Sequence, residues 1–261
     1  LANAELHSKS WQIQMYRLSD DFFHAASLYA QVIISELSLP VSLKSIQPVN
    51  IGGVAGGQKF IIDNILFKFA VDSELTNGTK KAYMYGGTEQ RNDLAMKAAS
   101  IEMRNMQTVL HARESNLFLP LMCVIDYQGH RIIASSILPI DKFTLAYGSS
   151  DGGRTVHRSI TELNTMMERL GKKLHLKEHK TGSRSGGRNL YMPGDIEVHL
   201  GMDNRYYMID VARLMPPEAP KPNDSSSTRK IYYQTLRAEL VLGYHDNLNS
   251  DAFSGWNDIE P

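Results

Sequence analysis

The chain of 261 residues carries 28 basic and 28 acidic residues and has no formal net charge. This balance excludes a global field that would draw the protein to nucleic acid, and the length suffices for one large domain or two lobes that share an interface. Cys123 is the single cysteine, so an intramolecular disulfide and a cysteine-cluster zinc site are excluded. No apolar run reaches the roughly 20 residues of a membrane span and no signal-peptide pattern opens the chain, so we expect a cytoplasmic protein.

The first predicted element is an amphipathic helix over residues 20–37, which Pro40 ends. Its apolar positions recur at helical spacing behind an acidic first turn. Because its polar face is not basic, we expect the apolar face to dock on the rest of the protein and not on a membrane. Residues 1–40 are therefore predicted to form an N-terminal docking segment.

A small β-rich region is predicted over residues 41–140, with short strands on either side of a glycine-rich loop. The loop glycines are Gly52, Gly53, Gly56 and Gly57. Exposed N–H groups in such a loop can hold a phosphate, although a plain flexible hairpin has the same composition. In the apolar run 60–70 that follows, Lys68 stands between Phe67 and Phe69, which point to the opposite face of a strand. Its amine therefore either reaches solvent or meets an anion.

A helix and a second hairpin complete this region. Helix formers with an apolar stripe predict a helix over Asn92–Ala112. The stripe consists of Ala95, Ala99, Met103, Met106 and Leu110. Glu102 falls at its margin, where it either points at the sheet edge or is solvated. Strands over 121–127 and 131–138 are expected around a Gln128–Gly129 turn, followed by a linker at 136–140.

Residues 141–261 are predicted to be larger and mainly helical, with helices over 159–174 and 232–242 and a loose tail over 247–261. Between the helices lies a hairpin with turn residues 201–204 and an acid at each end, Asp195 and Asp210. A carboxylate just past a buried apolar strand costs several kcal/mol without a partner, so a metal ion or a cationic partner is implied. The alternative is an ordinary surface hairpin whose aspartates cap turns.

The order of glycine loop, strand lysine, helix glutamate and two aspartates resembles that of phosphotransferases of the protein-kinase-like superfamily, including atypical kinases such as actin-fragmin kinase. The resemblance implies a two-lobed α+β fold, with a β-rich lobe over 41–140 and a mainly helical lobe over 141–261, that binds ATP with Mg²⁺ or Mn²⁺. By this resemblance Lys68 would hold the α- and β-phosphates beside the glycine loop, and Glu102 would orient Lys68. Asp195 would position an accepting hydroxyl, and Asp210 would bind the metal.

The sequence departs from the kinase pattern after the hairpin. Val211-Ala212 replaces the usual Phe-Gly, and no asparagine falls where the second metal ligand is expected, where His199 and Glu197 are the nearest candidates. These departures favour the alternative of a non-catalytic binding module with the same fold. For a catalytic protein we expect Asp195 to be accessible and Asp210 to lie deeper; the acceptor, a protein or a small molecule, is not named by the sequence.

Three further motifs, Tyr147–Gly153, Gly201–Glu218 and Leu236–Val241, resemble the central CLU domain of the clustered-mitochondria proteins in order and approximate spacing. Members of that family are cytosolic, are associated with mitochondrial distribution and with binding messenger RNA, and are not generally described as kinases. The resemblance spans residues 20–243 and implies a protein or RNA partner as the alternative to a nucleotide. A basic segment over residues 172–188 is the local support for RNA.

Overall fold

The computed structural model describes residues 9–51, 57–77, 80–182, 186–221 and 227–256. The chain divides into two compact units: residues 1–70 with 121–137 form the first unit, and residues 71–120 with 138–261 form the second unit. The chain passes from the first unit to the second for the last time between Ile137 and Leu138, within the predicted linker at 136–140. Gly57 has positive φ (58°), whereas Gly52, Gly53 and Gly56 lie outside the described residues.

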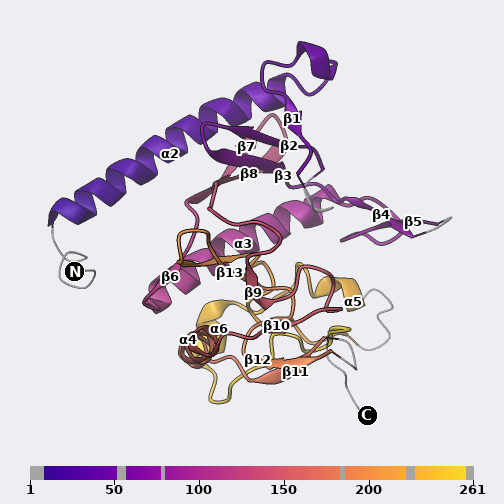
Figure 1. Cartoon of the computed structure of the whole chain (residues 1–261). Coiled ribbons are helices and arrows are strands. Elements are labelled where there is room, and N and C mark those ends of the chain that lie inside the picture. The colour runs from indigo at the N-terminus through magenta and orange to yellow at the C-terminus, as the bar shows by residue number, and fades with distance from the viewer. Residues whose placement is uncertain (1–8, 52–56, 78–79, 183–185, 222–226, 257–261) are drawn as a thin grey trace. The chain divides into compact units, whose positions relative to one another are not determined.

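The first unit is an antiparallel sheet with a long helix beside it (Figure 1). In sheet order the strands are β1 (Pro48–Val49), β2 (Lys59–Ile62), β3 (Ile65–Phe69), β8 (His130–Ser136) and β7 (Met122–Tyr127). Helix α2 (Lys9–Ser35) contacts β7 and β8, and a 3-10 helix, η1 (Val41–Leu43), follows it. On β3 the buried Phe67 and Phe69 alternate with the half-buried Lys68, as predicted.

Two tight turns set the register of this sheet. Asp63 and Asn64 both have positive φ (50° and 59°) and split the apolar run 60–70 into the hairpin β2–β3. The Gln128–Gly129 turn has the same left-handed backbone (φ 47° and 78°), which confirms the predicted hairpin β7–β8. The predicted start of the first helix at residue 20 is wrong: α2 already begins at Lys9, because residues 9–19 contain neither proline nor glycine to stop it.

The second unit is a mixed α+β structure around another five-stranded sheet. Its strands, in sheet order, are β10 (His157–Arg158), β9 (Leu145–Gly148), β13 (Glu197–Leu200), β14 (Tyr206–Ile209) and β6 (Leu117–Phe118). Two small ladders pair β4 (Glu74–Asn77) with β5 (Lys80–Tyr83) and β11 (His179–Thr181) with β12 (Arg188–Leu190). The helices are α3 (Asn92–Ala112), α4 (Thr161–Lys173), α5 (Ser227–Lys230) and α6 (Ala238–Gly243).

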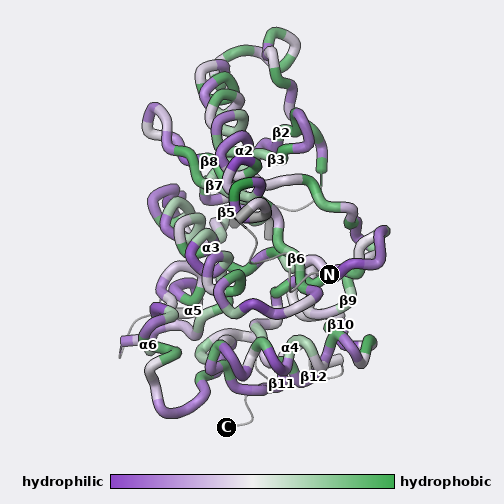
Figure 2. Tube along the Cα trace, turned by 90° about the vertical axis from the view of Figure 1, so that its left-hand side faces the viewer, coloured by the Kyte–Doolittle hydropathy of each residue, from purple (hydrophilic) through white to green (hydrophobic). Residues whose placement is uncertain are grey.

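Helices α3 and α4 and the hairpin β13–β14 confirm predicted elements. Hydrophobic and hydrophilic residues alternate along α4 (Figure 2), and its apolar side chains, such as Met167 and Leu170, are fully buried. The predicted stripe of α3 is wrong at Leu110, which is exposed, because the buried face runs instead through Asn105 and Val109.

The C-terminal region differs most from the predictions. The helix expected over 232–242 is restricted to α6, because Leu236 N–H donates to the Pro216 carbonyl (2.8 Å) and Thr235 bridges Pro217, so this segment is extended. The expected loose tail is wrong for residues 248–256, where Ser250 and Asp251 are buried. Tertiary pairing overrides local propensity in both places.

The core of the first unit yields a stability prediction. Phe67 is fully buried, lies opposite Phe60 across the β2–β3 ladder and makes an edge contact with Tyr29. We expect Phe67→Ala to lower the free energy of unfolding by about 3–5 kcal/mol. Ile61→Ala, at a partly exposed position on β2, should cost about 1 kcal/mol or less. Urea unfolding of both variants checks this, and equal losses would contradict the core assignment.

Candidate functional site

Asp195, the predicted catalytic aspartate, lies two residues before β13 and is held by an arginine. Arg213 donates from Nε to Oδ2 and from Nη2 to Oδ1, both at 2.7 Å. Parallel bonds of this kind from a guanidinium to a carboxylate are among the strongest ion-pair geometries in proteins. Only 3% of the Arg213 side chain and 30% of the Asp195 side chain are exposed. Asp195 therefore has a cationic partner within the protein, Arg213.

A second carboxylate, Asp251, completes this pair from the far end of the chain. Its Oδ1 accepts from Arg213 Nη2 (2.9 Å), and its Oδ2 accepts from the Gly194 N–H (2.9 Å) and lies 3.1 Å from His179 Nε2. Burial raises the pKa of Asp251, but the hydrogen bond from His179 and the charge of Arg213 lower that pKa by more, and it ends below its ordinary value. We call Arg213, Asp195, Asp251, His179 and Gly194 the Arg213 cluster.

Close packing surrounds the Arg213 cluster. A Cβ added at Gly194 would lie 2.4 Å from both Thr181 Oγ1 and a ring carbon of Trp256, so only glycine brings this N–H to Asp251. The guanidinium carbon of Arg213 lies 5.4 Å from the Trp256 ring centre and 5.9 Å from that of Tyr232, within cation–π range. Nε and Nη2 of Arg213 bind carboxylates of the protein itself, whereas the buried Nη1 has no hydrogen-bond partner among the described residues.

The predicted metal ligand Asp210 lies at the same end of the hairpin β13–β14 as Asp195, because Ile209, the residue before it, pairs with Glu197. It follows β14 with a left-handed backbone (φ 55°) and is exposed, so the expectation that it lies deeper than Asp195 is wrong: Arg213 covers the Asp195 carboxylate instead. Buried Asn105 on α3 donates to the carbonyls of Val211 (2.8 Å) and Ala212 (3.1 Å), which fixes the segment after Asp210. Glu102, half-buried, is three residues before Asn105 and so shares its side of α3.

The remaining predicted residues have neighbours of their own. His199 is buried, with Nε2 3.1 Å from Glu197 Oε2 and Nδ1 3.0 Å from Thr144 Oγ1. Over the described part of the chain, no three His, Cys, Asp or Glu side chains are grouped as a metal site. Lys68 belongs to the first unit, where it pairs in register with Lys59 and Ile133.

Two lysines of the predicted basic segment bind carboxylates of the second unit. Lys172 donates to Glu168 (2.7 Å), and Lys173 donates to Glu114 (2.8 Å), which also accepts from Arg169. Burial raises the pKa of Glu114, yet the hydrogen bonds from Lys173 and Arg169 lower it by more, with a net decrease. These contacts leave less positive charge for a nucleic acid than the sequence suggested.

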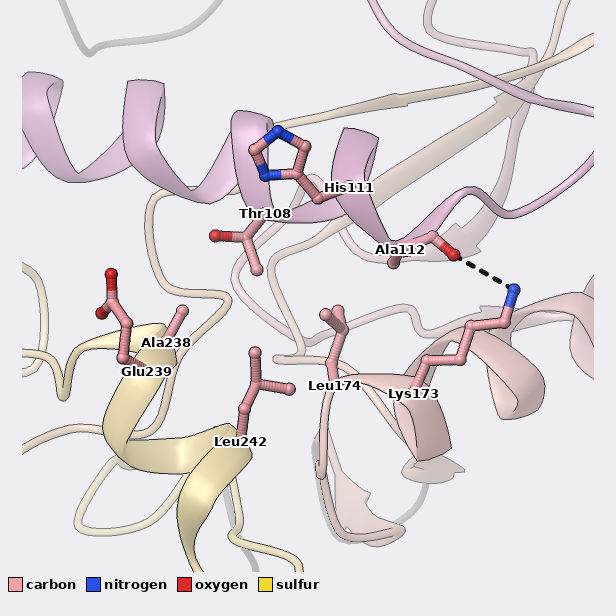
Figure 3. Close-up of a pocket in the computed structure, with 8 residues that line it drawn as sticks. All are labelled: Thr108, His111, Ala112, Lys173, Leu174, Ala238, Glu239 and Leu242. Carbon is pink, nitrogen blue, oxygen red and sulfur yellow. Dashed lines mark hydrogen bonds between the residues drawn. The ribbon is translucent and has the colours of Figure 1, made fainter. Parts of the chain in front are cut away.

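A hollow of about 330 Å³ opens between the ends of α3, α4 and α6 (Figure 3). Leu174 and Leu242 point into it, and Lys173 closes one side by donating to the Ala112 carbonyl (3.1 Å). It contains none of the residues predicted for catalysis or cofactor binding.

Sequence reasoning missed most of the Arg213 cluster. Arg213 stands in an otherwise apolar stretch, Val211–Met215, and an arginine in such a stretch is a signal of a buried ion pair. His179 and Asp251 gave no comparable signal, because their partners are distant in sequence. The role of Asn105 was not recognised, because it lies within a run of helix formers in α3.

Fold and site together define a mixed α+β protein whose second unit is organised by buried ion pairs. The model of the CLU family, described as Clustered mitochondria, matches residues 6–220, and the chain belongs to this family. It is 27% identical over 265 residues to the Clustered mitochondria protein of Arabidopsis thaliana, covering 88% of this chain and 18% of that protein. It is 28% identical over 228 residues to the Clustered mitochondria protein homolog of Phaeosphaeria nodorum, covering 78% of this chain and 17% of that protein.

The chain therefore spans less than a fifth of the length of these relatives. No solved structure matches it. Among the described residues, none of the helices has the length and apolar character needed to cross a membrane.

Removal of Arg213 tests the buried ion pairs. Arg213→Met leaves Asp195 and Asp251 without their cation, so we expect the free energy of unfolding to fall by about 3–5 kcal/mol. Arg205→Met is the matched control, since Arg205 is exposed and 3.5 Å from Asp203, and should change stability by about 1 kcal/mol or less. Chemical unfolding measures both, and a near-neutral Arg213→Met would contradict the role of the cluster.

Acid should also destabilise the second unit. Because the pKa values of Asp251 and Glu114 are lowered in the folded state, their stabilisation is complete above the unfolded values of about 3.9 and 4.3 and is lost as pH falls through the lower folded values. We expect unfolding free energy to decline below about pH 5.

Urea titrations at a series of pH values measure this decline. Asp251→Asn should flatten it, because the variant no longer takes up that proton on unfolding. An unchanged slope in Asp251→Asn would show that Asp251 is not among the responsible groups.

Proposed function

We propose that this chain is a non-catalytic binding module of the clustered-mitochondria family. The observation that carries the proposal is the bidentate bond from Arg213 to Asp195. A catalytic base needs a carboxylate oxygen within reach of the proton on the acceptor. Here both oxygens of the predicted base accept from a buried guanidinium, which suits a structural role.

The relatives' names point to the process that such a module serves. Both are named for clustered mitochondria, and we infer a contribution of this chain to the distribution of mitochondria as one part of a longer machinery. Its partner is proposed to be a protein. An RNA partner is less favoured, because Lys172 and Lys173 are paired with Glu168 and Glu114.

A second candidate function, nucleotide binding, is favoured by the geometry around Asp210. Its exposed carboxylate stands on a left-handed residue, and Asn105 fixes the segment that follows. Mg²⁺ is commonly held by one or two carboxylates together with nucleotide phosphates and water. Asp210 fits such a ligand, and bound Mg²⁺ or Mn²⁺ would neutralise the phosphates of ATP.

Two measurements on the same proteins separate these functions. With radiolabelled ATP offered to the chain, to generic proteins and to small polyols, we expect no phosphate transfer above that of Asp195→Asn. Transfer that depends on Asp195 would overturn the non-catalytic proposal and restore the phosphotransferase.

Thermal unfolding tests whether the chain binds a nucleotide. If Mg-ATP binds, a concentration 100 times the dissociation constant stabilises the fold by about 2.7 kcal/mol. Asp210→Asn should remove the metal-dependent part of this gain, whereas Asp203→Asn, an exposed aspartate in the turn of the same hairpin, should retain it. Absence of any shift with ATP, ADP or GTP would exclude the second candidate.

A further inference from the structure

The two halves of α2 have different surroundings. In the C-terminal half, Ala26, Ala30 and Ile33 are buried and the helix packs on β7 and β8. The half toward the N-terminus runs past this sheet (Figure 1) and exposes large apolar side chains. Tyr16 is 75% exposed and Ile13 is 52% exposed. A helix with so much exposed apolar surface is typical of an interaction site.

Three of these exposed apolar residues, together with Asp20, follow a regular spacing, and exposed Leu18 lies outside it. Ile13, Tyr16, Asp20 and Phe23 succeed one another at steps of three, four and three residues, which is the a/d pattern of a coiled coil. The same pattern continues through Ser27 to Ala30, which is buried in the first unit. Between Ile13 and Phe23 the stripe contains one polar residue, Asp20, and such a residue fixes the register of a helix pair.

The order of side chains fits a second copy of this chain running antiparallel. In that arrangement each a position meets a d position of the other helix, so Ile13 packs on Phe23 of the second copy and Tyr16 lies beside its Asp20. The Tyr16 hydroxyl can donate to that carboxylate, which is half-exposed and lies 3.5 Å from Nδ1 of exposed His24. Arg17, next to Tyr16, then lies near Asp20 and Asp21 of the second copy. Each contact occurs twice, as two-fold symmetry requires.

We infer that the N-terminal half of α2 is a self-association surface at which two copies of this chain pair as antiparallel helices. The charges favour this partner over a lipid surface, because Arg17 is accompanied by Asp20 and Asp21 and the helix lacks the basic face that anionic membranes attract. The surface is a few helical turns long, so the dimer is weak and depends on concentration.

Sedimentation of the chain over a range of concentrations tests the surface. We expect a monomer–dimer equilibrium, and Phe23→Asp should raise its dissociation constant at least about thirtyfold, as for the loss of a central aromatic contact. Leu28→Asp is the matched control, because Leu28 is exposed on α2 outside the stripe and should leave the constant unchanged. Unchanged melting temperatures show that the variants still fold.

Charge reversal tests the antiparallel arrangement. Arg17→Asp should weaken the dimer, and adding Asp20→Arg in the same chain should restore it, since each helix then supplies the partner for the other's reversed charge. A monomer at every concentration, a Phe23→Asp variant that dimerises like the wild type, or failure of the double reversal to restore pairing would each overturn the inference. Binding of monomers to lipid vesicles through this stripe would overturn it as well.

Discussion

The second unit depends on the ion pairs that the guanidinium of Arg213 forms with two carboxylates. The guanidinium joins Asp195, two residues before β13, to Asp251, and the Asp251 carboxylate also accepts a hydrogen bond from the Gly194 N–H and is hydrogen-bonded to His179. Burying these charges is expensive, and a well-packed apolar substitute is often as stable as a buried ion pair. Apolar contacts are not directional, whereas hydrogen bonds are. The two hydrogen bonds from Arg213 to Asp195 and the one to Asp251 permit a single alignment of the three segments that carry these residues.

The ion pair with Arg213 also explains why the role predicted for Asp195, at one end of the hairpin, differs from the role that the structure supports. An aspartate at each end of a hairpin is compatible with catalysis, and the sequence implied a metal ion or a cationic partner for the carboxylate just past the buried strand. It did not show that Asp195, before the hairpin, is held by Arg213, a few residues beyond it. Asp195 and Asp210 are close in sequence and similar in pattern, yet one carboxylate is held by Arg213 and the other is exposed.

The parts that the sequence predicted well are those fixed by local rules. Helix α3 and the hairpins β7–β8 and β13–β14 follow from periodicity and from turn residues with left-handed backbone, such as Gly129 and Asn204. The parts that it predicted poorly depend on partners far along the chain. Residues 234–236 pair with 216–218, and Asp251 bonds to Arg213, so neither the extended segment before α6 nor the ordered C-terminal segment can be recognised from neighbouring residues in the sequence.

The first unit is discontinuous, because β3 pairs with β8 only after residues 71–120 have been contributed to the other unit. On a ribosome that adds about 5–20 residues per second, several seconds pass between the synthesis of the apolar β3 and that of β8, the strand with which it pairs. During that time α3 leaves the exit tunnel before the sheet is complete. A nascent chain of this topology exposes an unpaired strand edge during synthesis, and such an edge is prone to pair with other chains.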